Sequence, residues 1–116
     1  MRQKGDDMQL CLFVLICDYG MEEPLADWLL EYADDMVFSS EPIDCHGIAH
    51  EALSSREQVS GRQRKLMLQM QLAMDQAEQL RDALARAFPN AALRYWITPV
   101  IGAGQLEHGR WHSAGE

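Results

Sequence analysis

The run of eight residues from Leu10 to Cys17 (LCLFVLIC) constrains the fold more than any other part of the sequence, because every residue in it is apolar. In a β-strand, successive side chains point to opposite faces, so this run is apolar on both faces. Both faces must then be covered. The run is too short to cross a bilayer as a helix, so we expect a buried strand and no membrane insertion.

The residues that follow alternate between helical and extended patterns. Pro24 suits the first turn of a helix, and Leu25, Trp28, Leu29 and Tyr32 recur at the spacing of a core-facing helical stripe. A second stripe comprises Ala77, Leu80, Leu84, Ala87 and Phe88, after a D-x-x-E capping box from Asp75 to Glu78. The predicted order is strand 8–17, helix 21–33, strand 36–44, strand 62–73, a helix from Asp75 to Pro89, and strand 93–100.

This β-α-β-β-α-β order predicts an α+β, ferredoxin-like fold with a four-stranded antiparallel sheet and both helices on one face. The other face of the sheet has no helix to cover it. The first strand is apolar on that side, and the third strand places Met67 and Ala73 there beside Gln69 and Gln71. Such a face is a poor solvent surface, so we expect subunits to associate through it.

Length and composition indicate one domain over residues 8–106, with a disordered N-terminus over 1–7 and a mobile tail over 107–116. The net charge of −8 argues against a nucleic-acid partner, which requires a broad basic surface. The three cysteines have no regular spacing and do not suggest a disulfide framework. Free thiols are typical of a reducing compartment, so we expect a cytoplasmic protein.

Basic residues gather where the third strand begins. No Lys or Arg occurs between Lys4 and Arg56, and then Arg62, Arg64 and Lys65 follow closely. Arg62 and Arg64 are two residues apart, so on a strand they point the same way and could bind an anion. Arg94 is a weaker member of this group. The alternative is that these cations pair with acidic side chains of the same or a neighbouring subunit.

A second candidate site is the C-H-x-x-x-H pattern of Cys45, His46 and His50. Thiolate and imidazole ligands suit a transition metal ion such as zinc or copper. The spacing matches no known zinc finger, and a structural zinc site needs a fourth ligand. The alternative is that these residues are structural or incidental. Because no nucleophile elbow, phosphate-binding loop or H-E-x-x-H motif is present, we expect no enzyme activity.

Three segments carry a resemblance to a known family: EALSSREQVSGRQRKLMLQMQL, the helix end LARAFPNA, and LRYWITPVIGAGQL. With the long loop between the second and third strands, the chain resembles the PII-like superfamily of nitrogen-regulatory and CutA proteins. It is most similar to a small uncharacterised proteobacterial family that is often encoded beside heavy-metal efflux pumps. The E-Q-V-x-G-R-x-R run from Glu57 to Arg64 is the most distinctive part.

The resemblance implies a homotrimeric signalling protein that senses a small ligand, such as an adenine nucleotide, in a cleft between subunits. The loop would contact a partner protein, for which a membrane efflux pump is the candidate. The alternatives are a metal-binding accessory protein of efflux and, third, a small enzyme with its site in the cleft. The implied loop residues of the site are Gly47, Glu57, Gln58 and Gly61.

Overall fold

The structure is a computed structural model that describes residues 9–47 and 62–107. The predictions made for the N-terminus, for most of the long loop and for the tail beyond residue 107 lie outside these residues. The described elements are β1 (Leu10–Asp18), the 3-10 turn η1 (Tyr19–Met21), α2 (Glu22–Tyr32), β2 (Ser39–His46), β3 (Arg62–Ala73), α4 (Met74–Ala87) and β4 (Arg94–Pro99).

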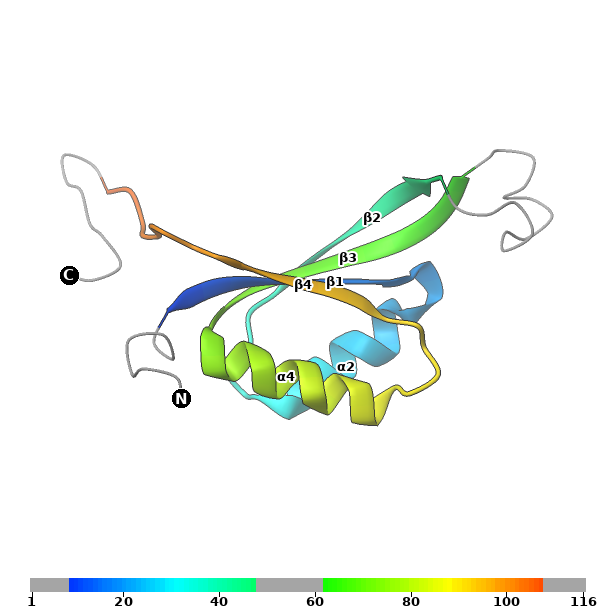
Figure 1. Cartoon of the computed structure of the whole chain (residues 1–116), viewed down its shortest axis with the longest axis horizontal. Coiled ribbons are helices and arrows are strands. Elements are labelled where there is room, and N and C mark those ends of the chain that lie inside the picture. The colour runs from blue at the N-terminus through cyan, green and yellow to red at the C-terminus, as the bar shows by residue number, and fades with distance from the viewer. Residues whose placement is uncertain (1–8, 48–61, 108–116) are drawn as a thin grey trace.

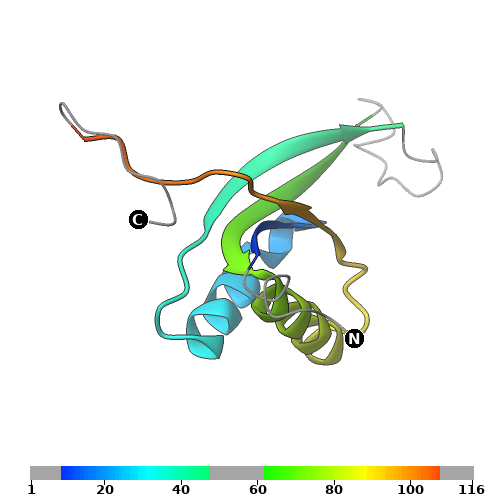
Figure 2. The ribbon, with the colours of Figure 1, turned by 60° about the vertical axis from the view of Figure 1, so that its left-hand side comes forward.

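The four strands form one sheet in the order β2-β3-β1-β4, and each neighbouring pair is antiparallel. Both helices lie against the same face of this sheet (Figure 1). Seen from another side, α2 and α4 run next to each other below the strands (Figure 2). The predicted α+β, ferredoxin-like fold is therefore confirmed, with β1 between two partners.

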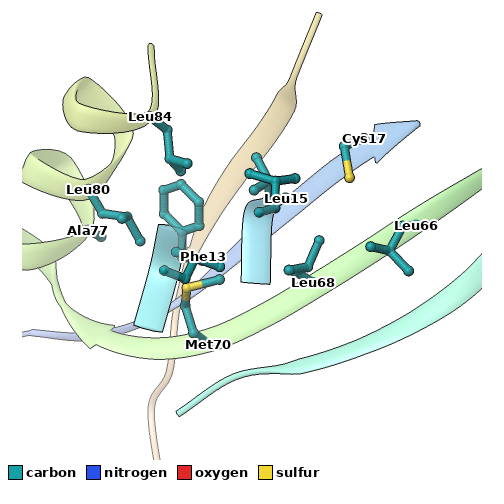
Figure 3. Packing of buried hydrophobic residues seen from close by; sticks show 11 residues of the cluster. Phe13, Leu15, Cys17, Leu66, Leu68, Met70, Ala77, Leu80 and Leu84 are labelled. Carbon is teal, nitrogen blue, oxygen red and sulfur yellow. The ribbon is translucent and has the colours of Figure 1, made fainter. Parts of the chain in front are cut away.

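The hydrophobic core fills the space between the helices and this face of the sheet, which we call the helix side. Figure 3 shows Phe13 and Leu15 of β1 facing Leu80 and Leu84 of α4. The same cluster contains Cys17 of β1, Leu25 and Leu29 of α2, and Leu66, Leu68 and Met70 of β3. All of its members are buried to 2% exposure or less.

Trp28 fills the seam between the two helices rather than the centre of the core. Its ring stacks on Tyr32 at 5.1 Å between centroids and meets Phe88 edge-on at 5.8 Å. Trp28 is half-buried and Tyr32 is exposed. The predicted core-facing stripe is thus confirmed at Leu25 and Leu29, whereas Trp28 and Tyr32 lie nearer the surface.

Three predicted details of the elements were wrong. The helix α4 begins at Met74, so Asp75 lies inside it, and Gln76 Oε1 accepts the backbone N–H of Ala73 at 3.1 Å. Gln76, not the Asp75–Glu78 pair, therefore closes this end. Strand β2 begins three residues later than predicted, at Ser39, because residues 33–38 form a turn and a connection from α2 that does not pair with β3. Ala87, predicted to be buried, is exposed at the end of α4.

Candidate functional site

The face of the sheet opposite the helices, which we call the open face, is apolar at its centre. Val14 and Ile16 of β1 are 3% and 5% exposed although no helix covers them, because neighbouring strand side chains enclose them. Trp96 of β4 lies beside Val14 and is 43% exposed. The paired registers place these residues on the open face: Leu12, Val14, Ile16, Met67, Gln69, Gln71, Arg94, Trp96 and Thr98.

The hairpin of β2 and β3 extends beyond the rest of the sheet. β1 pairs with β3 only from Lys65 onward, so residues 62–64 have β2 as their one strand partner in the described part of the chain. This end of the hairpin rises away from the helices (Figure 1). It is the point at which the long loop begins and ends, and it carries three of the four predicted cations, Arg62, Arg64 and Lys65.

Arg62 and Arg64 lie on the helix side, in alternation with Leu66 and Leu68. Arg62 Nη1 donates to Asp44 Oδ2 at 3.3 Å. Both side chains of this pair are largely exposed, so the contact stabilises the fold by only about 0–1 kcal/mol. The guanidinium of Arg64 lies 4.9 Å from the ring centroid of Tyr19 in η1, which ties the hairpin to the end of β1.

Lys65 and Arg94 lie on the open face, opposite to Arg62 and Arg64. Lys65 Nζ donates to Asp18 Oδ1 at 2.7 Å, in the last paired position of β1 and β3. Arg94 is opposite Ile16, on the other side of β1. The structure therefore divides the four predicted cations into two pairs on opposite faces of the sheet. One protomer cannot direct all four at a single anion.

The predicted metal ligands are only partly within the described residues. Cys45 and His46 are consecutive in β2, so their side chains leave opposite faces of the strand. His50 lies outside the described residues, as do Glu57, Gln58 and Gly61. In the part of the chain that the structure describes, no group of three His, Cys, Asp or Glu side chains could hold a metal ion. The metal site stays a prediction.

Gly47 follows the last residue of β2 and has a φ of +81°, which is the left-handed region that glycine adopts without strain. A Cβ atom at this position would meet no atom within 4 Å, so space does not require glycine here. The backbone conformation does. Gly47 therefore serves the turn that leads into the loop.

The two cysteines of β1 are inert core residues, as their apolar surroundings predict. Burial, followed by the nearby charge of Asp18, raises the pKa of the Cys17 thiol to about 11. Burial also raises the pKa of Cys11, whose Sγ lies 3.9 Å from Met74 Sδ. Since the thiolate is the nucleophile and the metal ligand, neither thiol is suited to those roles near neutral pH.

Sequence reasoning missed a group of residues between α4 and β4. A hollow of about 280 Å³ is lined there by residues from β1, α4, the connection after α4, and β4. Strand alternation does predict that Tyr95 points to the helix side, but the gap between the helix and the strand has no sequence signal. The residues that matter most in this hollow are Phe13, Arg81, Leu84, Phe88, Leu93 and Tyr95.

None of the described helices is long and apolar enough to span a bilayer.

Comparison with known proteins gives a family and a fold. The sequence profile of a family described as "Protein of unknown function (DUF3240)" matches residues 7–107. No curated protein matches the chain. A DUF3240 family protein from Shewanella baltica has a similar structure, with a TM-score of 0.66 and 22% identity over 85% of this chain and 98% of that one.

Two further solved structures share the fold. A putative PII-like signaling protein from Thermus thermophilus superposes with a TM-score of 0.56 at 15% identity, over 80% of this chain and 88% of that one. CutA from Synechococcus elongatus, complexed with Bis-Tris, gives a TM-score of 0.60 at 17% identity, over 84% and 85% of the two chains. The expected PII-like fold is therefore confirmed.

Proposed function

Because the chain belongs to the DUF3240 family and has a PII-like fold, we propose that it is a homotrimeric regulatory protein. It senses a small anionic ligand at the clefts between subunits. Ligand binding changes the contact of the hairpin and its loop with a partner protein, for which a membrane efflux pump is the candidate implied by the family resemblance. The proposal includes no catalytic step.

The observation that carries this proposal is the apolar open face. An apolar centre with an exposed aromatic side chain beside it is typical of a protein interface, and Trp96 at 43% exposure is such a residue. The helix side is already covered by α2 and α4. We therefore expect the open face to pack against the open faces of other copies of the chain.

The strand directions show how copies can join edge to edge. All three neighbouring pairs are antiparallel, so β4 runs opposite to β2 at the two ends of the sheet. If copies are related by an axis along the strands, β4 of one copy meets β2 of the next in antiparallel orientation, with every open face toward the axis. This arrangement pairs the backbone N–H and C=O groups of the two edge strands between copies, and it also covers the apolar face.

The charges on the two edges are complementary. Glu41 of β2, Met67, Ile16 and Arg94 of β4 form one row across the sheet. A junction without stagger brings Arg94 of one copy opposite Glu41 of the next, on the same face. In this arrangement Arg94 serves the interface between subunits, and Lys65 keeps its partner Asp18.

The two remaining cations are the candidates for the ligand. Arg62 and Arg64 lie on the helix side at the hairpin end, and the connection from α4 to β4 lies at the same end of the sheet (Figure 1). In the proposed ring, the hairpin of one copy adjoins this connection of its neighbour. A cleft between subunits would thus be bounded by Arg62 and Arg64 from one copy and by residues 88–93 from the other.

The interface is tested by charge reversal and light scattering. We expect a trimer at micromolar concentration for the unaltered protein and about tenfold weaker association for Arg94→Glu or Glu41→Arg alone. The double variant should recover the trimer, and Arg86→Glu, an exposed site on α4, serves as the control. A monomeric unaltered protein would overturn the trimer. A double variant that stays dissociated would overturn only the Arg94–Glu41 pairing.

The ligand is tested by calorimetry with ATP, ADP and AMP, and separately with zinc, copper, nickel and cobalt ions. Loss of a nucleotide response in Arg62→Ala with Arg64→Ala, but not in Arg86→Ala, supports an anion in the cleft. A metal response that disappears in Cys45→Ser would instead support the metal-binding alternative. Nucleotide binding that is unchanged by loss of both arginines contradicts the site proposed here.

A further inference from the structure

The hollow between α4 and β4 is built by a single protomer and has an apolar interior. Phe13 and Leu15 of β1 lie beneath it, buried to 0% and 1% exposure. Leu84 of α4 and Phe88, which follows the last residue of α4, form one wall. Tyr95 of β4 forms the opposite wall, and its ring stacks over Phe13 with 5.8 Å between centroids and 10° between planes. The cavity therefore extends the aromatic part of the core to the surface.

Arg81 is the one charged residue among those that line this hollow. Its Nε donates to Asp82 Oδ1 at 3.0 Å, and hydrogen bonds to Asp82 and to Tyr95 raise the pKa of the guanidinium. These contacts orient the guanidinium of Arg81, whose side chain is 35% exposed and lines the hollow. A guanidinium has five N–H donors, which is more than these two partners use, so it retains donors for an anion.

The connection at the mouth of the hollow holds an unfavourable backbone conformation. Ala92 has a φ of +52°, and it is the one non-glycine residue with positive φ among the described residues. Alanine rarely adopts this region, and such conformations persist where the surrounding structure imposes them, often at ligand sites. Ala92 itself lines the hollow. The strained backbone of Ala92 and the guanidinium of Arg81 therefore belong to the same cavity.

We propose that this hollow binds a small monoanion with one apolar ring, of the aromatic carboxylate class. The ring lies between the Leu84–Phe88 wall and Tyr95, and the carboxylate pairs with the guanidinium of Arg81. Planar forked donors suit a carboxylate, and aromatic walls suit a flat ring.

Size and charge separate this ligand from a nucleotide. The volume of about 280 Å³ lies just below the range of about 300–1,000 Å³ that is usual for drug-sized ligands. A single ring with a short acidic group fits such a volume. Arg81 is the one lining cation and already pairs with Asp82, so the hollow suits one added negative charge at most, whereas a nucleotide polyphosphate carries several. The hollow shares the connection of residues 88–93 with the proposed cleft between subunits, but its ligand pairs with Arg81 of the same protomer and not with Arg62 or Arg64.

The test is titration with benzoate, followed by calorimetry and by amide NMR shifts. Benzyl alcohol supplies the ring without the charge, and acetate supplies the charge without the ring. We expect saturable benzoate binding that shifts the amides of Leu84 and Tyr95, and no saturable binding of acetate. Arg81→Gln should weaken benzoate about tenfold and leave benzyl alcohol unchanged. Ala85→Phe, which fills the hollow, should abolish both.

Arg86→Gln is the matched control, because Arg86 is on the same helix but does not line the hollow. The proposal is overturned if benzoate produces no shifts up to its solubility limit, if acetate binds as well as benzoate, or if Arg86→Gln weakens benzoate as much as Arg81→Gln. The Arg94→Glu variant separates this proposal from the trimer. Benzoate binding that persists in that variant shows a site within one protomer, whatever the oligomeric state.

Discussion

The two faces of β1 carry similar side chains and have different surroundings. On the helix side, Phe13 and Leu15 pack against α2 and α4 within one protomer. On the open face, Val14 and Ile16 are enclosed only by side chains of neighbouring strands, with Trp96 exposed beside them. An apolar residue thus has two uses in this sheet. On one face it holds the protomer together, and on the other it is available to hold copies together.

The largest expected effect is on the helix side. Phe13→Ala removes a fully buried ring that contacts both α4 and Tyr95, and should lower the free energy of unfolding by about 3–5 kcal/mol. Val14→Ala, the neighbouring position on the open face, should cost about 1.6 kcal/mol, from two methyl-sized groups. Urea unfolding at one fixed protomer concentration measures both. Equal losses at the two positions would contradict the distinction between the faces.

The next effect should appear in association rather than in folding. Trp96→Ala removes a half-exposed ring from the open face and should weaken trimer formation by about 2 kcal/mol or more per interface. Light scattering over a dilution series measures this change. The circular dichroism spectrum of the variant should match that of the unaltered protein. Tyr95→Phe, the adjacent residue on the helix side, should leave association unchanged.

An effect of similar size on the helix side depends on pH. The folded-state pKa of Cys17 is raised from 9.0 to about 11, so the fold favours the protonated thiol. This contribution is fully present below pH 9 and is lost as the pH rises from 9 to 11, by roughly 2–3 kcal/mol in total. Between pH 8 and pH 11, the free energy of unfolding measured in urea should therefore fall more steeply for the unaltered protein than for Cys17→Ala. Parallel curves would show that Cys17 does not contribute.

The smallest effect is expected at the exposed ion pair of the hairpin. Asp44→Asn removes the partner of Arg62 and should change the free energy of unfolding by about 0–1 kcal/mol, because both side chains are largely exposed. Urea unfolding of this variant beside the unaltered protein measures the difference. A loss as large as that of Phe13→Ala would mean that the hairpin end is buried in the assembly.

The strands could be read from the sequence because the side-chain period decides which residues share a face. Residues 62–73 were predicted as a strand with the bounds that the structure has, and the two faces of β1 were assigned correctly. The same period, applied to Lys65, would have separated it from Arg62 and Arg64. The four predicted cations therefore fall into two pairs on opposite faces of the sheet.

Other features depend on distances that no local pattern encodes. Helix α4 begins one residue before its predicted cap because the backbone N–H of Met74 donates to the carbonyl oxygen of Gln9, which fixes the end of β3 from across the sheet. The hollow beside Arg81 depends on how far α4 lies from β4. Neither separation follows from propensity or periodicity, since both result from tertiary packing.

Strand β3 runs without interruption from the end of the hairpin to the first turn of α4. Its twelve residues, at about 3.3 Å each, span roughly 40 Å. The strand is paired with β2 near Arg62 and with β1 up to Ala73, so its backbone is held along its whole length. We therefore expect a displacement of the hairpin to be transmitted along this paired strand to the amino end of α4.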